Sequence, residues 1–420
     1  MAEFEAEFEA EFERSPVLHV ERTADACIKC NICNTVCPVS AVTDLFPGPK
    51  YEGPQGQRFR AGIEDGGSPD HSLDYCSGCG LCTQACPEGV MVAEINSLAR
   101  EKLVRDRGGL SLRDKLVCRP TLMGRLARPV APLANLAVAN PAVRWLIEKV
   151  MGVHRKAAMP SFSPVSFRSW ARRHPPLASA ERTVAYFHGC ATQEYEPEVG
   201  AALVRVLERN GVRVTFPRQN CCGLPLISNG DFDAARRFSS RLMAKLARAA
   251  DDPGVIVANS TSCGMTLKAK YRELLGMADE RTAKVSRAVY DICEYLAGLA
   301  DDGQLDTSFN PLPAKAIYHP QCQLMAHGVG TPAVDLLKLV PGLQIELSTV
   351  GCCGMAGTYG TRVEKYDIAM DVGKGLWEQA RTVKPDFIVC DSETCRWHIA
   401  AATGLPVYHP VQVLDRAYRT

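Results

Sequence analysis

From about residue 180 to the C-terminus, short apolar runs alternate with longer segments in which apolar residues recur every three or four positions. Runs such as TVAYF and AKAIY are typical of buried strands, whereas EVGAALVRVLERN has the periodicity of a helix with one apolar face. Strands of this kind separated by helices predict a largely parallel sheet that other elements cover. We therefore expect an α/β architecture over this part of the chain.

The same region repeats itself at an offset of 131 or 132 residues. Cys190 recurs as Cys322, and the turn NCCGLP recurs as GCCGMA. Further positions that keep the offset are Pro253, Ile256, Val257, Ser260 and Cys263, which match Pro385, Ile388, Val389, Ser392 and Cys395. An internal duplication explains this register and predicts two α/β lobes, residues 179–305 and 306–420, related by a pseudo-twofold axis.

The first hundred residues follow a different pattern, dense in cysteine. Residues 1–19 form an acidic extension that begins MAEFEAEFEAEFER, where phenylalanine recurs every four positions and would lie on one helical face. We leave this extension out of the fold. Residues 20–100 contain two cysteine sets separated by a Gly/Pro-rich loop and followed by the helical run VAEINSLAREKLV.

Both cysteine sets have the spacing C-x2-C-x2-C-x3-C-P. This spacing is typical of bacterial ferredoxins with two [4Fe-4S] clusters, in which three close cysteines bind one cluster and the fourth binds the other. The pattern assigns Cys27, Cys30, Cys33 and Cys86 to one cluster, and Cys76, Cys79, Cys82 and Cys37 to the second. Two zinc knuckles are the alternative, but zinc sites favour pairs of C-x2-C arms or include histidine. The 38 residues between the sets favour a helical ferredoxin domain over the compact ferredoxin hairpin fold.

Each lobe has four cysteines in equivalent places: one follows a strand, two adjacent ones occupy a glycine turn, and one begins a helix. We expect the four to converge at the carboxyl edge of the sheet and to form a metal or cluster site. These residues are Cys190, Cys221, Cys222 and Cys263 in the first lobe, and Cys322, Cys352, Cys353 and Cys395 in the second. An iron-sulfur cluster, a zinc ion and simple packing of buried thiols are the open alternatives.

Packing is the better explanation for Cys118, Cys293 and Cys390, which lie outside the repeat. Two histidines, His188 and His319, precede the first cysteine of their lobes and are candidates to supply a hydrogen bond or a proton there. A structural role at the strand end is the alternative for both.

The composition of the chain excludes several classes of function. The odd count of 19 cysteines argues against a closed disulfide framework and favours metal ligands. A net charge of +1 provides no overall field that would attract nucleic acid, so we expect no nucleic-acid partner. The chain shows no Ser-His-Asp order and no phosphate loop, and we assign no catalytic residue.

Residues 101–178 form a basic linker between the cysteine sets and the lobes. Residues 100–173 contain sixteen Lys or Arg but only four Asp or Glu. A helical linker with solvated charges is one interpretation, and an amphipathic anchor on an anionic membrane surface is the other. No stretch approaches the roughly 20 apolar residues that span a bilayer, so we expect any membrane contact to be peripheral.

Together these patterns predict an α+β multidomain protein. An N-terminal helical ferredoxin domain with two [4Fe-4S] clusters is followed by the linker and by two duplicated α/β Cys-Cys-Gly lobes.

Several stretches are specific beyond their cysteines, namely ACIKCNICNTVCPVS, FPGPK, RPTLMGRLARPVAPLAN, AYFHGC, CCGLPLISNG, CCGMAGTYG and DSETCRWHI. From about residue 24 onward, the chain resembles the family of C subunits of anaerobic glycerol-3-phosphate dehydrogenase. The resemblance implies a peripheral subunit on the cytoplasmic side of the inner membrane. Such a subunit takes electrons from flavoprotein dehydrogenase subunits and delivers them toward menaquinone, with no substrate pocket of its own.

Two other functions remain as alternatives. Heterodisulfide reductase and the glycolate or lactate oxidase iron-sulfur subunits belong to the broader Cys-Cys-Gly family, which commonly ends each motif with C-x2-C. Here Ser260 and Ser392 take the first of those positions, and Cys390 lies two residues upstream. Four thiolates suffice for a cubane or a zinc ion, whereas a five-cysteine non-cubane cluster would lack a ligand, which disfavours disulfide reduction. A zinc scaffold without redox function is disfavoured by the paired ferredoxin runs.

Overall fold

The computed structural model describes residues 15–62 and 69–419. The predicted helical face of residues 1–14 therefore lies outside the described residues. Two four-stranded parallel sheets form the α/β region, with the same strand order, β2-β1-β3-β4 and β6-β5-β7-β8. The strands are β1 Arg182–Phe187, β2 Val212–Thr215, β3 Ile256–Ala258, β4 Val289–Asp291, β5 Ala314–Tyr318, β6 Leu343–Leu347, β7 Phe387–Val389 and β8 Val407–Tyr408. The two parallel sheets and the duplication are confirmed.

The fourth strand of each sheet, β4 or β8, is not among the strands that the apolar runs of the sequence indicate. Strand β4 has three residues and β8 has two, and polar or proline residues interrupt the apolar pattern around both, in RAVYDI and LPVYHP. Each of these strands leads into a helix that ends its lobe, α19 Ile292–Asp301 and α25 Pro410–Arg419. Helix α19 begins with a capping box between Asp291 and Glu294.

Other helices cover the two sheets. In the first lobe they are α12 Gly189–Glu194, α13 Pro197–Arg209, α14 Leu224–Ser228, α15 Phe232–Asp251, α16 Thr261–Met265, α17 Tyr271–Glu273 and α18 Glu280–Ala288. In the second lobe they are α20 Cys322–Ala326, α21 Pro332–Lys338, α22 Tyr366–Val372, α23 Lys374–Val383 and α24 Glu393–Thr403.

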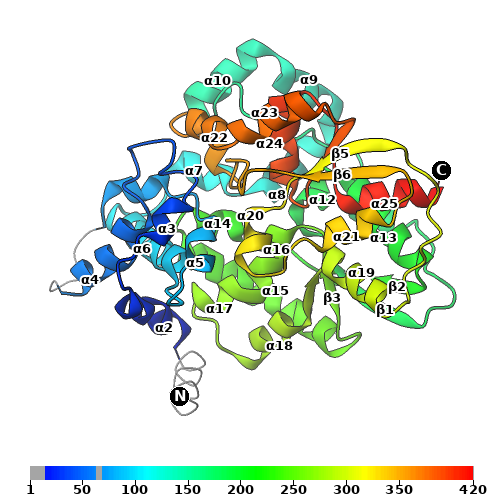
Figure 1. Ribbon diagram of the computed structural model, residues 1–420, viewed down its shortest axis with the longest axis horizontal. Coiled ribbons are helices and arrows are strands. Elements are labelled where there is room, and N and C mark those ends of the chain that lie inside the picture. Colours follow the sequence, from blue (N-terminus) through cyan, green and yellow to red (C-terminus); the bar gives the residue numbers. More distant parts are fainter. Residues whose placement is uncertain (1–14, 63–68, 420) are drawn as a thin grey trace.

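The two lobes share one hydrophobic core. Helix α13 of the first lobe packs on α25 of the second, and α21 of the second packs on α19 of the first (Figure 1). Buried side chains of both sheets, such as Val184 and Val389, belong to the same cluster. This reciprocal packing is what a pseudo-twofold relation between the lobes produces, and it holds them as one unit.

The N-terminal module is helical and lies at one end of the molecule, coloured blue in Figure 1. Its helices are α2 Pro16–Arg22, α3 Ile32–Thr35, α4 Gly56–Ala61, α5 Leu81–Gln84 and α6 Val92–Asp106. The short helices α3 and α5 each follow the second cysteine of a set and pack on one another. Helix α5 also packs on α20 of the second lobe.

The linker helices are α7 Leu112–Val117, α8 Pro120–Ala127, α9 Ala131–Ala139, α10 Pro141–Met151 and α11 Phe167–Ala171. Helix α8 packs on α12, while α9 and α10 lie at the periphery of the molecule (Figure 1). Among the described residues, no single helix is both long and apolar enough to cross a membrane. Residues Pro120–Ala139 and Pro141–Met151 pass that test together but are bent by 94° at the break.

Candidate functional site

The first cysteine group consists of Cys27, Cys30, Cys33 and Cys86, which line one small cavity. Burial raises the pKa of the Cys33 thiol, and the nearby sulfurs of Cys27 and Cys86 raise it further. Because Cys86 comes from the second run and the other three from the first, the structure brings together the four residues that the sequence assigned to one site. Cys30 is exposed at the surface.

The second group consists of Cys37, Cys76, Cys79 and Cys82, all of them buried. Burial raises the pKa of Cys82 well above its ordinary value, and the sulfurs of Cys79 and Cys76 act in the same direction. Four thiols in so apolar a setting would remain protonated unless a positive centre stabilised their thiolates. This donor set therefore fits an iron-sulfur cluster, which supplies that positive charge.

The second group lies directly against the second lobe. Burial raises the pKa of Cys79, and the sulfur of Cys352 is its strongest neighbouring charge. The approach depends on Gly80, which has φ of +87° and whose absent Cβ would lie 2.7 Å from the Cβ of Ala326 on α20. A side chain at this position would push the ferredoxin module away from the lobe.

The four cysteines of each lobe meet in the same pairs. In the first lobe, the Sγ atoms of Cys222 and Cys263 are 3.3 Å apart and those of Cys190 and Cys221 are 4.0 Å apart. In the second lobe, Cys322 hydrogen-bonds Cys352, and Cys395 hydrogen-bonds Cys353. The structure thus brings the four cysteines of each lobe together at the carboxyl edge of its sheet, as we expected.

The glycine after each cysteine pair shapes the turn and donates to a sulfur. The Gly354 amide donates to Cys352 Sγ at 3.3 Å, and the Gly223 amide donates to Cys221 Sγ at 3.4 Å. A hydrogen bond from Cys322 lowers the pKa of Cys352, and the Gly354 amide lowers it further. In both lobes the pKa of the first cysteine of the adjacent pair is lowered, which favours the thiolate, the ionic form that binds metals.

All eight lobe cysteines line a single cavity of about 90 Å³ together with Cys79. The two lobe sites therefore face one another, and only the second lobe contributes sulfurs that adjoin the ferredoxin module.

The two histidines differ in their surroundings. His319 is fully buried and lines the shared cavity, whereas His188 does not line it and packs against Phe167 and Tyr186. Burial lowers the pKa of both imidazoles to about 4, so both are neutral at physiological pH. Neither can serve as a proton donor in its resting state.

Three residues that sequence reasoning assigned to packing or overlooked lie close to these sites. Asp291, Cys293 and Asp391 form a fully buried cluster between the lobes, with one potential ligand atom of each within 4.8 Å of the others. Burial and the charge of Asp391 raise the pKa of Asp291 to about 7, and burial raises that of Asp391 to about 6. Two buried carboxyls so close share a proton. The repeat offset, which matches Asp391 to Asn259, was a signal for one of them.

Cys390, expected only to pack, in fact touches a lobe cysteine. Its side chain hydrogen-bonds that of Cys395 from the core side, but it does not line the shared cavity.

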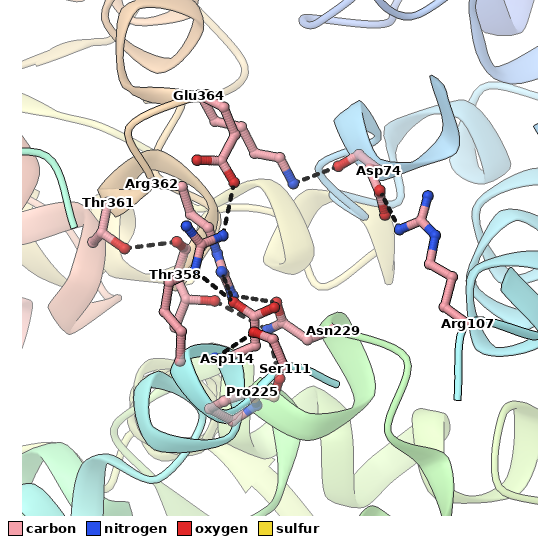
Figure 2. Close-up of polar contacts among 12 residues, drawn as sticks. Asp74, Arg107, Ser111, Asp114, Pro225, Asn229, Thr358, Thr361, Arg362 and Glu364 are labelled. Carbon is pink, nitrogen blue, oxygen red and sulfur yellow. Dashed lines mark hydrogen bonds and ion pairs between the residues drawn. The ribbon is translucent and has the colours of Figure 1, made fainter. Parts of the chain in front are cut away.

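Polar contacts lock the ferredoxin module, the linker and both lobes together (Figure 2). Arg362 of the second lobe pairs with Asp114 of the linker and donates to Asn229 Oδ1 of the first lobe at 2.9 Å. Lys365 Nζ donates to the backbone carbonyl of Asp74, in the ferredoxin module, at 2.6 Å. These residues line a cleft of about 360 Å³ beside Cys76.

Comparison with known proteins agrees with this architecture. Residues 184–268 and 316–400 match the family described as "Cysteine-rich domain", and residues 23–90 match the "4Fe-4S dicluster domain". Iron-sulfur clusters are therefore cofactors of this chain.

Several curated relatives match almost the whole chain. It is 34% identical over 395 residues to the C subunit of anaerobic glycerol-3-phosphate dehydrogenase from Escherichia coli (strain K12), a match that covers 93% of this chain and 98% of the relative. It is 26% identical over 414 residues to the B subunit of fumarate reductase (CoM/CoB) from Methanothermobacter marburgensis, covering 93% and 72%. It is 25% identical over 416 residues to the glycolate oxidase iron-sulfur subunit of Escherichia coli (strain K12), covering 96% and 97%.

These relatives are subunits of larger oxidoreductases, so this chain too has partner subunits. The chain belongs to the family of C subunits of anaerobic glycerol-3-phosphate dehydrogenase, whose members are iron-sulfur electron-transfer subunits.

Proposed function

We propose that this chain relays electrons from a flavoprotein glycerol-3-phosphate dehydrogenase toward menaquinone while it anchors the complex to the membrane. The order of its sites runs from the first cysteine group to the second, and from there into the second lobe. One observation carries this order: Cys37, Cys76 and Cys79 pack in one buried cluster with Cys322 and Cys352 of the second lobe. The 34% identity to the dehydrogenase relative supports the electron source, and the family resemblance supports the acceptor.

In this proposal the first and second cysteine groups each hold a [4Fe-4S] cluster, and each lobe group holds a further iron-sulfur cluster or a zinc ion. The eight ferredoxin cysteines are the ligands of the first two. Metal analysis of anaerobically purified protein should give about eight iron atoms per chain from these two sites alone. A content near zero iron with several zinc atoms would replace this function with a zinc scaffold.

The flavoprotein partner is expected to dock beside the first group. Cys30 is exposed there, and the neighbouring apolar side chains of Ile28, Ile32 and Val36 also face solvent. An apolar patch around a solvent-facing ligand suits a transient redox interface that brings two centres close.

Substituting Ile28→Asp tests this docking site. Reduction of the chain by glycerol 3-phosphate and its flavoprotein subunits should slow, while chemical reduction by dithionite stays unchanged. Leu339→Asp is the control, because Leu339 is a comparably placed exposed apolar residue on the second lobe. Equal rates for both variants would move the docking site elsewhere. Cys30→Ser should remove one cluster from the electron paramagnetic resonance spectrum and leave the lobes folded.

Helices α8 to α10 carry the features expected of a membrane anchor. Leu126, Leu133, Leu136 and Val150 are each about two-thirds or more exposed, an unusual density for a surface. Burial of such side chains in a lipid surface stabilises attachment by about 25 cal/mol per Å² of apolar area.

The basic residues of this segment divide into two kinds. Arg128 pairs with the buried Glu194, and Arg144 donates to the carbonyls of Arg155 and Ala157, so these two fold the segment. Arg119, Arg125 and Lys149 are exposed on the same helices or beside them, and they are the cations that an anionic surface would attract.

Flotation with anionic liposomes tests the anchor. The double variant Leu133→Ser with Leu136→Ser should lose most binding, and Arg125→Gln with Lys149→Gln should weaken it mainly at low salt, where charges are least screened. Leu347→Ser, an exposed leucine of the second lobe, is the matched control. Equal flotation of all variants would show that the segment is a linker or a surface for another protein of the complex.

A further inference from the structure

The ring of His319 lies directly after the end of β5, three residues before Cys322, and lines the cavity that contains the four cysteines of the second lobe. It has no exposed surface. Its Nε2 atom has no hydrogen-bond partner within the part of the chain that the structure describes. A buried polar atom without a partner is destabilising, so a bound group at this position would explain it.

The hydrogen bond on the other side of the ring fixes which nitrogen carries the proton. His319 Nδ1 lies 3.0 Å from Ser348 Oγ, and that hydroxyl already donates to the carbonyl of Val350. The hydroxyl oxygen can therefore only accept from His319, and we assign the proton to Nδ1. Nε2 is left with a lone pair and no hydrogen, so it can accept or coordinate but cannot donate.

The partners open to that lone pair are few. In the empty site, cysteine thiols could donate to it. Once Cys322, Cys352, Cys353 and Cys395 bind metal, they do so as thiolates and have no hydrogen to give. An iron centre is then the electron acceptor that remains, and imidazole is a ligand that suits iron.

We propose that His319 Nε2 is a fifth ligand of the metal group held by the four cysteines of the second lobe. Ser392, which follows β7 of the same lobe, offers no thiolate for this position. This inference rests on the proposed occupancy of the second lobe. Its tautomer follows the usual design of a metal-bound histidine, whose second ring nitrogen donates to a neighbour that orients the ring.

The first lobe supplies the control. His188 Nδ1 also donates, to the carbonyl of Gly189 at 2.9 Å, so its tautomer is the same. Its ring, however, packs among aromatic side chains and does not line the cavity. The two histidines thus share their chemistry and differ in their access to the metal site.

The experiment compares His319→Gln, His188→Gln and His319→Cys in the full chain, purified anaerobically. We expect His319→Gln to lose the metal of the second lobe, as Cys353→Ala does, and His188→Gln to keep it. His319→Cys should restore the metal content of the second lobe, because it supplies a thiolate at this position.

Spectroscopy gives a direct readout of the bond. If the metal is iron, a histidine nitrogen should appear by pulsed electron paramagnetic resonance of chains labelled with 15N-histidine. If the metal is zinc, X-ray absorption should show four sulfur neighbours that fill the tetrahedral shell, and this result would overturn the inference.

The outcomes separate this inference from the proposed function. If Cys353→Ala loses metal while His319→Gln keeps all of it with no change in the spectra, the inference is overturned and the lobe site stands. If Cys353→Ala loses no metal, the second lobe is unoccupied and both fail. The ferredoxin signals should persist in every variant and show that the chain is folded.

Discussion

The two lobes are built alike and used differently. Each has the same strand order, the same pairing of four cysteines and the same glycine turn. Both lobes contact the ferredoxin module, but among the described residues only the second lobe packs its cysteines with Cys37, Cys76 and Cys79, and only the second has a histidine on the cavity wall. Duplication supplied two equivalent sites, and contact with the rest of the chain made them unequal.

The difference teaches that symmetry of ligands does not imply symmetry of function. Asn259 and Asp391 occupy equivalent positions and accept hydrogen bonds from equivalent tyrosines, Tyr186 and Tyr318, at 2.7 Å in both cases. Yet one is a neutral amide and the other an acid that shares a proton with Asp291. The second lobe therefore holds an ionisable group where the first has none.

The largest effect is expected at the glycine turns. Gly354 and Gly223 both have positive φ, but a Cβ on Gly354 would overlap the backbone oxygen of Ala369, whereas on Gly223 the nearest atom is 3.8 Å away. Gly354→Ala should lower the free energy of unfolding by about 3 kcal/mol or more, and Gly223→Ala by about 1–2 kcal/mol. Denaturant titrations of the full chain measure both. Equal losses would mean that the second lobe relaxes around the new side chain.

A smaller effect concerns pH. The pKa values of Asp291 and Asp391 are raised in the folded chain, so the folded state binds more protons than the unfolded state between about pH 4 and pH 7. The free energy of unfolding should therefore fall as pH rises through this window.

The variant Asp391→Asn should abolish most of that slope, because it keeps the acceptor for Tyr318 and removes the shared proton. Denaturant midpoints at pH 5 and pH 8 provide the measurement. Asp335→Asn, at an exposed site, is the control. A slope that survives in Asp391→Asn would show that the two carboxyls titrate independently.

Electron flow sharpens the comparison further. Cys353→Ala should reduce electron delivery to quinone by about tenfold or more, since loss of a metal ligand disables a site on the path. Cys222→Ala should reduce it as well, but less, because the first-lobe cysteines do not belong to the buried cluster that joins Cys37, Cys76 and Cys79 to the second lobe. Reduction of the ferredoxin clusters by substrate should persist in both. A larger loss in Cys222→Ala than in Cys353→Ala would place the first lobe before the second on the electron path.

The smallest effect separates the two tyrosines. Tyr318→Phe removes a donor to an acid, and Tyr186→Phe removes a donor to an amide. We expect losses of about 2 and 1 kcal/mol in the free energy of unfolding. The difference between these two losses should be smaller in a chain that also carries Asp391→Asn. If Tyr318→Phe costs the same free energy of unfolding with and without Asp391→Asn, Asp391 is protonated when it accepts from Tyr318.

Much of this organisation is readable from the sequence because it is local or repeated. The spacing of Cys27, Cys30 and Cys33 encodes a cluster-binding turn within seven residues, and the offset of 132 encodes the duplication. Both lobes and all their strands except β4 and β8 follow from periodicity. These patterns can be read without knowing which distant residues are in contact in the folded chain.

The features that the sequence does not predict are contacts between residues far apart in the chain. Nothing near Gly80 indicates that it abuts Ala326, and nothing in a basic linker tells that Arg128 and Arg144 have folded-state partners while Arg125 faces solvent. The pairing of Asp291 with Asp391 joins positions that the repeat does not relate. Each of these contacts arises from tertiary packing, which leaves no periodic trace.

The junction of Arg362, Asp114, Asn229 and Lys365 has a consequence for how charge moves in this molecule. A carrier that swings on a flexible tether delivers electrons at a pace set by its own diffusion and by solvent viscosity. Here the ferredoxin module is fixed to both lobes and to the linker by side chains drawn from all of them. Transfer between its sites therefore takes place across fixed distances and is insensitive to viscosity, and the module cannot be exchanged as an independent cassette without redesigning the lobe that receives it.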